Sequence, residues 1–250
     1  MDLDLDGCIV LVTGGVRGVG AGISEVFAGQ GATVITCARR PVEGSPYEFH
    51  NCDVRDPDAV GALIDAVVER HGRLDVAVNN AGGSPYALAA DASPRFHQKI
   101  IELNLLGMLH VSQAANAVMQ KQDGGGSIIS VSSVSGSRPS PGTAAYGAAK
   151  AGVDSLTATL AVEWAPKVRV NAVVAGMVAT EQAELFYGNS ESQAAVAATV
   201  PLRRLAKPTD IGWAAAFLAS NAASYISGAV LPVHGGGEPP QYLSASTANK

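Results

Sequence analysis

The segment 9-IVLVTGGVRGVG-20 decides how this chain folds. Its first residues form an uninterrupted apolar run, which is typical of a strand buried on both faces of a parallel sheet. The glycines that follow allow the backbone to turn sharply and to approach a ligand closely, and a helix after such a turn points its free N–H groups at that ligand. We therefore expect a strand, a turn that binds a diphosphate, and a helix. A tight turn that binds nothing is the alternative.

The same alternation of short apolar runs and Ala-rich helical stretches continues along the chain. The expected strands are Cys8–Thr13, Thr33–Cys37, Leu74–Val78, Ser127–Val131, Val168–Val174 and Ala229–Val233, with Tyr47–Cys52 as a weaker candidate. The expected helices are Gly18–Gln30, Pro57–His71, Arg95–Gln120, Ala145–Ala165 and Thr209–Ser220. Strands that alternate with helices predict an α/β fold, a Rossmann-type doubly wound sheet of about seven parallel strands with helices on both faces.

No linker, internal repeat or block of charge interrupts this pattern, so residues 1–250 are interpreted as a single dinucleotide-binding domain. Residues 176–207 lie between an expected strand and an expected helix, which is the natural place for a lid over a substrate. The Gly-, Pro- and Ser-rich residues 235–250 are expected to form a C-terminal arm.

Composition excludes several classes of function. Hydrophobic residues make up 47% of the 250 residues, the net charge is −5, and no run of Lys or Arg is present. A nucleic-acid partner is therefore not expected, because phosphate-backbone binding requires a basic stripe. The acidic amino terminus has too short an apolar run for a signal peptide or membrane span. The three cysteines and five histidines lack metal-ligand spacing, so we expect reduced thiols, a cytoplasmic location and no metal site.

The end of the second expected strand bears on the choice of dinucleotide. In a doubly wound sheet an acidic residue at this point binds the ribose 2′-hydroxyl of NAD, whereas this chain has Ala38, Arg39 and Arg40 there. Arg17 lies in the glycine turn itself. Guanidinium groups give charge-assisted contacts to a 2′-phosphate, so the sequence favours NADP(H) over NAD(H). Solvated loop arginines are the alternative.

Tyr146 and Lys150 stand in the segment 144-AAYGAAKAG-152, which otherwise contains only Ala and Gly. On a helix, residues four apart share a face. A free tyrosine titrates near pH 10, and a cation about 4–5 Å away at an effective dielectric constant of about 20 favours the phenolate by roughly 3–4 kcal/mol. We therefore expect Lys150, helped by the positive charge of an oxidised nicotinamide, to bring Tyr146 toward the range of a general acid and base.

Five motifs, in order along nearly the whole chain, resemble the short-chain dehydrogenase/reductase family. They are the glycine turn (Thr13, Gly14, Gly18, Gly20), 79-NNAG-82, Asn104 in 103-LNLLG-107, Ser133, which lies thirteen residues before Tyr146, and Tyr146 with Lys150. Two positions depart from the family pattern. Ala175 replaces a usual proline, which could loosen the following loop, and His234 stands where Asp or Asn is common and is interpreted as a packing residue.

The resemblance implies a set of roles. Tyr146 exchanges a proton with the substrate oxygen, Ser133 polarises that oxygen, Lys150 also binds the nicotinamide ribose, and Asn104 anchors a water that connects Lys150 to solvent. Val178 and Thr180 bind the nicotinamide carboxamide, and Asp53 with Val54 is expected to receive the adenine. The remaining expected cofactor contacts are Gly14, Arg17, Gly18, Val19, Gly20, Arg39, Asn80, Ala81 and Gly82.

The implied function is NADP(H)-dependent interconversion of a ketone and its secondary alcohol. A mostly apolar set of presumed pocket residues favours a hydrophobic substrate, either steroid-like or 3-oxoacyl thioester-like: Tyr86, Leu88, Met177, Leu185, Phe186 and Tyr187. The alternatives are a non-catalytic NADP-binding regulator, an NAD-linked alcohol dehydrogenase of the same family, a sugar-nucleotide epimerase and an enoyl thioester reductase. Members of the family associate through the Ala-rich faces of the two long helices, here Arg95–Gln120 and Ala145–Ala165, so the resemblance implies a homo-oligomer, with a tetramer favoured over a dimer.

Overall fold

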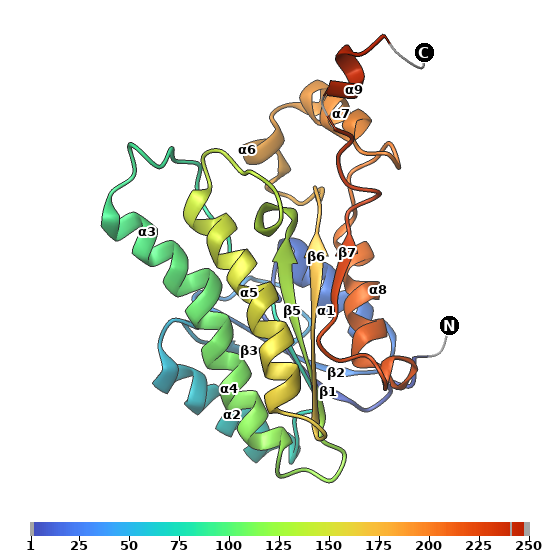
Figure 1. The fold of residues 1–250 in the computed structure, drawn as a ribbon. Helices are drawn as coiled ribbons and strands as arrows, with labels where there is room; N and C mark the ends of the chain where they lie inside the picture. Colours follow the sequence, from blue (N-terminus) through green and yellow to red (C-terminus); the bar gives the residue numbers. More distant parts are fainter. Residues whose placement is uncertain (1–2, 241, 248–250) are drawn as a thin grey trace.

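The computed structural model describes residues 3–240 and 242–247. Seven strands form one sheet in the order β3-β2-β1-β4-β5-β6-β7, and every neighbouring pair is parallel (Figure 1). The strands are β1 (Ile9–Thr13), β2 (Thr33–Ala38), β3 (Glu48–Asn51), β4 (Val76–Asn79), β5 (Gly126–Ser133), β6 (Val168–Ala175) and β7 (Val230–Val233). The expected doubly wound α/β fold is thus confirmed.

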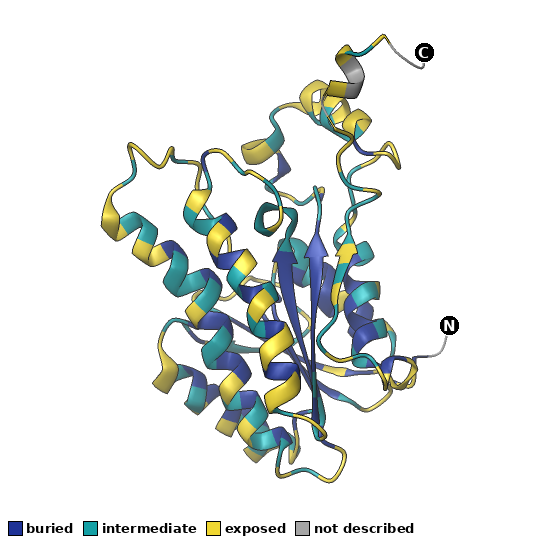
Figure 2. Ribbon diagram, in the orientation of Figure 1, coloured by how far each residue is buried: buried dark blue, intermediate teal, exposed yellow. Residues whose placement is uncertain are grey.

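Helices cover both faces of this sheet. One face packs against α1 (Gly18–Gly29) and α8 (Pro208–Ala219), and the other packs against α2 (Pro57–His71), α4 (Gly107–Met119) and α5 (Ala144–Glu163). Within β1, Val10 and Val12 belong to the first core and Leu11 to the second. The strand must be apolar on both faces for this reason, and Figure 2 shows the central strands buried between the two helical layers.

The long helix expected over Arg95–Gln120 is interrupted. It consists of α3 (Pro94–Ile101), a π-helical turn η1 (Glu102–Leu106) and α4. The fully buried Asn104 lies in this turn, and its Nδ2 donates to the Ile100 carbonyl at 2.9 Å. A side-chain donor on a helix carbonyl competes with the regular backbone bond, so Asn104 is part of the local cause of the wider turn.

Two further helices lie in the segment expected to be an irregular lid. They are α6 (Ala183–Tyr187) and α7 (Ser190–Thr199), and Figure 1 shows them beyond the carboxyl ends of β5 and β6. The remaining short elements are η2 (Val134–Gly136), η3 (Asn221–Ala223) and α9 (Tyr242–Ala245). The last belongs to the expected C-terminal arm, of which residues 241 and 248–250 lie outside the described part of the chain.

The strand order reverses between β1 and β4, and the two strand ends are bonded to each other there. The Thr13 hydroxyl accepts hydrogen bonds from the Asn80 and Ala81 amides, both at 3.0 Å. The Asn80 Nδ2 donates to the Thr13 carbonyl at 2.9 Å. A crevice at such a reversal is where doubly wound sheets bind their ligands, so these bonds fix the floor of the candidate site.

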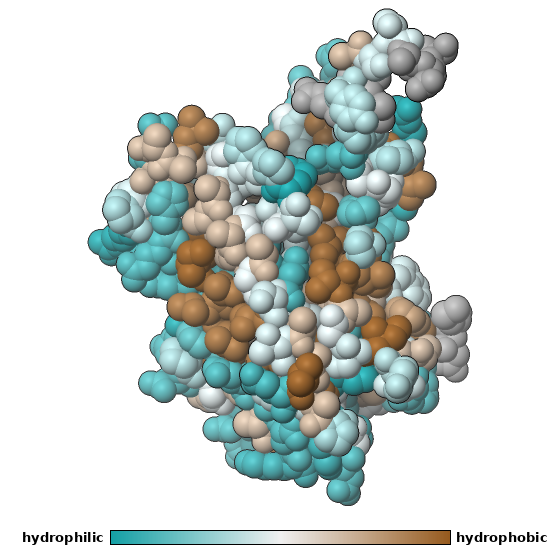
Figure 3. Space-filling view, in the orientation of Figure 1, coloured by the Kyte–Doolittle hydropathy of each residue, from teal (hydrophilic) through white to brown (hydrophobic). Residues whose placement is uncertain are grey.

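Apolar side chains also reach the outer surface. Figure 3 shows them over the helical layer in front of the sheet and along β7. Val162, which is 80% exposed, and Trp213, which is 48% exposed, are among the large apolar side chains left uncovered in the single chain. Within residues 3–240 and 242–247, no helix is long and apolar enough to span a membrane.

The glycine turn leaves no room for a side chain at Gly20, and α1 offers its own control. A Cβ at Gly20 would lie 2.5 Å from Asn80 Nδ2 and would overlap the Gly14 carbonyl, whereas a Cβ at Gly29 of the same helix meets nothing within 4 Å. We expect Gly20→Ala to lower the free energy of unfolding by about 2–3 kcal/mol and Gly29→Ala to raise it by up to about 1 kcal/mol. Urea unfolding of both variants measures this, and equal stability would contradict the packing described for the turn.

Candidate active site

At the start of α1 the glycine turn presents a backbone amide, that of Gly18, to a group outside the helix. Gly14 and Gly18 have φ of 64° and 54°, a left-handed conformation that favours glycine. The Gly18 amide donates to the Glu181 Oε2 at 3.1 Å. A carboxylate of the chain itself therefore occupies the amide that was expected to bind a diphosphate.

The loop after β4 forms the opposite wall of the crevice. The Asn104 Oδ1 accepts from the Gly83 amide at 2.8 Å, and its Nδ2 donates to the Gly83 carbonyl at 3.0 Å. A Cβ at Gly82 would lie 2.7 Å from the Asn104 Oδ1 and 3.6 Å from the Lys150 Nζ. The structure thus brings Gly82, Asn104 and Lys150 together, and its contacts give Asn104 the role of holding this loop.

Lys150 is buried with only 3% of its surface exposed. Its Nζ donates to the Val131 carbonyl on β5 at 2.7 Å and lies 3.9 Å from the Met108 sulfur. Burial lowers the pKa of Lys150 to about 7, and the nearby Asp154 carboxylate opposes part of this shift. Burial raises the pKa of Asp154, and a hydrogen bond from Ser132 and the Lys150 charge oppose it. Asp154 was not among the expected site residues, although its position four residues after Lys150 on a helix could have indicated it.

Tyr146 lies beside Lys150 as its spacing predicts, with the Lys150 Nζ 5.5 Å from the centre of the ring. Burial raises the pKa of Tyr146, and a hydrogen bond with Ser133 opposes part of the rise. The sequence-based expectation that Lys150 lowers the pKa of Tyr146 is therefore wrong for the protein without cofactor. The expectation omitted desolvation. Burial favours the neutral amine of Lys150 over its ammonium form, and it favours the neutral phenol of Tyr146 over the phenolate.

Ser133 ends β5, and its register with Tyr146 brings the two hydroxyl-bearing side chains together. Its Oγ also accepts from the Ser135 amide at 3.2 Å. The neighbouring Ser132 instead donates to the Lys150 carbonyl at 3.3 Å. The structure thus distinguishes Ser133, which contacts Tyr146, from Ser132, which contacts the backbone of α5.

The lid contributes Val178, Thr180 and Tyr187 to the same region. Thr180 is close to the glycine turn, since its Cγ2 would lie 3.7 Å from a Cβ at Gly18. Burial raises the pKa of Tyr187, while a hydrogen bond from the Val178 amide and the charge of Arg138 oppose the rise. Tyr187 also contributes to the raised pKa of Tyr146. The lid therefore reaches both the glycine turn and the tyrosine.

Asp53 and Val54, which were expected to receive the adenine, follow β3 and lie near Arg39. Both carboxylate oxygens of Asp53 accept from the Arg55 Nε, at 2.9 and 3.2 Å, and this pairing lowers the pKa of Asp53. Val54 is buried, and its carbonyl lies 3.3 Å from the His110 Nδ1. The charge of Arg39 also lowers the pKa of Asp53. Both Arg39 and Arg17 are exposed. Arg55 was not among the expected site residues.

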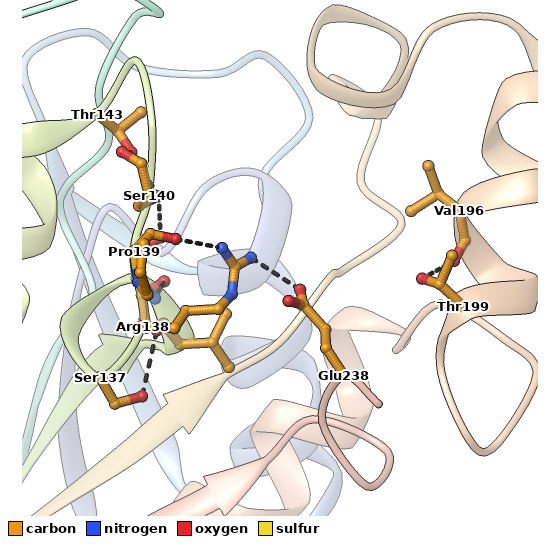
Figure 4. A network of polar contacts seen from close by, with 11 residues as sticks. Ser137, Arg138, Pro139, Ser140, Thr143, Val196, Thr199 and Glu238 are labelled. Carbon is orange, nitrogen blue, oxygen red and sulfur yellow. Dashed lines mark hydrogen bonds and ion pairs between the residues drawn. The ribbon is translucent and has the colours of Figure 1, made fainter. Parts of the chain in front are cut away.

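The C-terminal arm reaches the loop between β5 and α5. Figure 4 shows the Arg138 guanidinium between the carbonyl of Pro139 and the carboxylate of Glu238, with distances of 3.0 and 2.9 Å. His234 packs against Gly176, where a Cβ would lie 2.7 Å from the His234 Cβ, so the structure gives this residue a packing contact. Within the described residues no group of three or more His, Cys, Asp or Glu side chains could hold a metal ion.

Known proteins show what class of protein this is. Residues 14–238 match the family described as Enoyl-(Acyl carrier protein) reductase. The 3-oxoacyl-[acyl-carrier-protein] reductase FabG of Thermotoga maritima is 36% identical over 93% of this chain and 98% of that protein. The oxidoreductase UcpA of Escherichia coli K12 is 38% identical over 96% and 98%. The structure of Thermoplasma acidophilum aldohexose dehydrogenase is 33% identical, with a TM-score of 0.90 over 100% and 99% of the two chains.

Fold and similarity together define an oxidoreductase that binds a nicotinamide cofactor. Within that class, the chain belongs to the short-chain dehydrogenase/reductase family.

The buried Lys150 makes the stability of the cofactor-free protein depend on pH. Its pKa of about 7 lies below the value of about 10.4 in an unfolded chain, so between these values the unfolded state binds more protons and stability rises with pH. We expect Lys150→Met to raise the free energy of unfolding by about 2–4 kcal/mol at pH 6.5, and this gain to shrink as pH rises above 7. Urea unfolding at pH 6.5 and 9 measures it, with the exposed Lys121→Met as control. A gain that does not change with pH would contradict the burial cost.

Proposed function

We propose that this protein is an NADP(H)-dependent oxidoreductase that interconverts a hydrophobic ketone and its secondary alcohol. The observation that carries the proposal is the arrangement of Ser133, Tyr146 and Lys150. Tyr146 is hydrogen bonded to Ser133, and the buried amine of Lys150 lies beside its ring. A non-catalytic NADP-binding regulator would not need this constellation, so catalysis is the better reading. The nicotinamide supplies or accepts the hydride when it is bound.

The tyrosine works best as a proton donor in this arrangement. Its raised pKa keeps the phenol protonated near neutral pH, so Tyr146 donates a proton to the carbonyl oxygen and Ser133 polarises that oxygen by hydrogen bonding. With a pKa of about 7, Lys150 exchanges protons readily at physiological pH and returns a proton to the phenolate. In the reverse reaction the same groups would accept the proton from the alcohol.

The apolar lid and the relatives support the substrate class. Leu185 and Phe186 on α6 are 80% and 62% exposed, and Tyr86 and Leu88 in the loop after β4 are 73% and 47% exposed. The FabG relative is named for a 3-oxoacyl thioester, which carries a ketone on an apolar chain. A 3-oxoacyl thioester-like or steroid-like ketone is therefore the proposed substrate. Enoyl thioester reduction, suggested by the family's description, ranks below it, because the spacing of Ser133 and Tyr146 favours carbonyl chemistry.

The cofactor preference and the assembly are further parts of the proposal. Arg39, with Arg17, would hold the 2′-phosphate of NADP(H), and an NAD-linked enzyme is the alternative. Exposed apolar side chains on the helical layer, such as Val162, support a homo-oligomer, and a tetramer is favoured. Free cysteines support a reducing compartment, the cytoplasm. Residues 176–207 would act as the substrate lid within a single domain.

Removing the phenol hydroxyl of Tyr146 tests the chemistry. We expect Tyr146→Phe to lower kcat on a responsive ketone by about 10²–10⁴-fold, the range for loss of a general acid, with little change in NADPH binding. The fully exposed Tyr225 gives the matched control, Tyr225→Phe, which should keep its turnover. NADPH oxidation with a panel of 3-oxoacyl thioesters, steroid ketones and an enoyl thioester provides the measurement. Full turnover by Tyr146→Phe would refute the role.

Reversing the charge at Arg39 tests the cofactor preference. We expect the wild type to bind NADPH at least about tenfold more tightly than NADH, which corresponds to roughly 1.4 kcal/mol, and Arg39→Asp to abolish the difference. Fluorescence titration with both cofactors measures it, and Arg40→Asp is the neighbouring control. A loss of preference in Arg40→Asp alone would move the role to Arg40, and equal binding of both cofactors by the wild type would overturn the NADP(H) assignment.

A further inference from the structure

A side chain of the lid occupies the amide that the proposed function reserves for the cofactor. Glu181 follows Thr180, and its Oε2 accepts from the Gly18 amide at 3.1 Å. Its Oε1 would lie 3.9 Å from a Cβ at Gly18, so both carboxylate oxygens stand at the start of α1. This end of a helix carries partial positive charge, and a hydrogen bond to an ionised acceptor is stronger than a neutral one.

A second lid residue lies near another backbone donor of the predicted site. The Val178 amide acts on the Tyr187 hydroxyl and lowers its pKa, and Val178 is expected to bind the nicotinamide carboxamide. Glu181 and Tyr187 lie six residues apart in one segment. The contact that occupies a predicted cofactor donor is the one from Gly18 to Glu181.

We propose that Glu181 determines the affinity for the cofactor by occupying the diphosphate position in the cofactor-free protein. The inference rests on the proposed function, since it assumes that a dinucleotide binds at this turn. A carboxylate and a diphosphate cannot share one amide hydrogen, and like charges within a few ångströms repel. Binding is therefore an exchange, in which Glu181 leaves the Gly18 amide as the phosphate arrives.

The exchange weakens the apparent affinity by the fraction of molecules in which the turn is open. Where that fraction is about one tenth, the apparent Kd is about tenfold higher than the intrinsic value. The lid is suited to such a movement, because Leu185 and Phe186 on α6 remain exposed and α6 ends at Gly188, whose φ is 79°. Ala183 is the buried residue of α6.

The chain offers a matched pair of variants for the test. Glu181→Gln and Glu184→Gln each remove one negative charge from the lid, but only Glu181 contacts the glycine turn, and Glu184 is exposed. We expect the Kd for NADPH, measured by fluorescence titration of the full chain, to fall about three- to tenfold in Glu181→Gln. Glu181→Ala should bind at least as tightly as Glu181→Gln, because Gln can still accept a neutral hydrogen bond, and Glu184→Gln should match the wild type.

Three outcomes decide between the possibilities. Equal or weaker binding by Glu181→Gln and Glu181→Ala overturns the exchange, because Glu181 would then be neutral or would help to hold the bound cofactor. An equal gain in Glu184→Gln overturns it as well, because a general charge effect would explain the gain. Failure of the wild type to bind either NADPH or NADH overturns the proposed function instead.

A measurement without cofactor tests the contact itself. We expect hydrogen exchange at the Gly18 amide of the cofactor-free protein to be slow in the wild type and in Glu184→Gln, and about tenfold or more faster in Glu181→Ala. The same exchange rate in all three proteins would overturn the contact, whatever the protein binds.

Discussion

The hydroxyl of Thr13 holds together the two strand ends on which the site is built. At the β1–β4 boundary the following segments leave toward opposite faces of the sheet, and the two ends need a direct connection. The Thr13 hydroxyl at the end of β1 accepts hydrogen bonds from the amides of Asn80 and Ala81, which follow β4. The glycine turn then lies on one side of the crevice and the Gly82 loop on the other, each in a fixed register.

Desolvation governs the chemistry inside that crevice. The same burial that removes water from Lys150 makes its proton easy to lose, and it makes the proton of Tyr146 hard to lose. In the proposed mechanism the phenol therefore donates a proton, and the nearby amine resupplies it. The buried amine disfavours the folded state below pH 7, and functional sites commonly carry such a cost. Hydrogen bonding to the Val131 carbonyl limits that cost.

The sequence predicted the fold and the proximity of Tyr146 to Lys150 because both depend on local patterns. Apolar runs without alternation identified the buried strands, and a four-residue spacing placed Tyr146 beside Lys150 as the structure confirms. The direction in which the pKa of Tyr146 shifts could not be predicted from the neighbouring charge alone, because the burial that raises it depends on the whole fold. The π-helical turn at Asn104 was missed for a related reason: helix periodicity does not record a side chain that bonds the Ile100 carbonyl.

The contact of Glu181 was not predicted, although Gly18 and the neighbouring Thr180 were both placed in the cofactor site, because the sequence does not mark Glu181 as the acceptor for an amide 163 positions away. The consequence of this contact extends past cofactor binding. Tyr187, six residues after Glu181 in the same segment, also contributes to the raised pKa of Tyr146. In the proposed exchange, movement of this segment would therefore change the surroundings of Tyr146 as the cofactor binds. The proposal thus predicts that occupancy of the glycine turn and the pKa of Tyr146 are linked through one short stretch of chain.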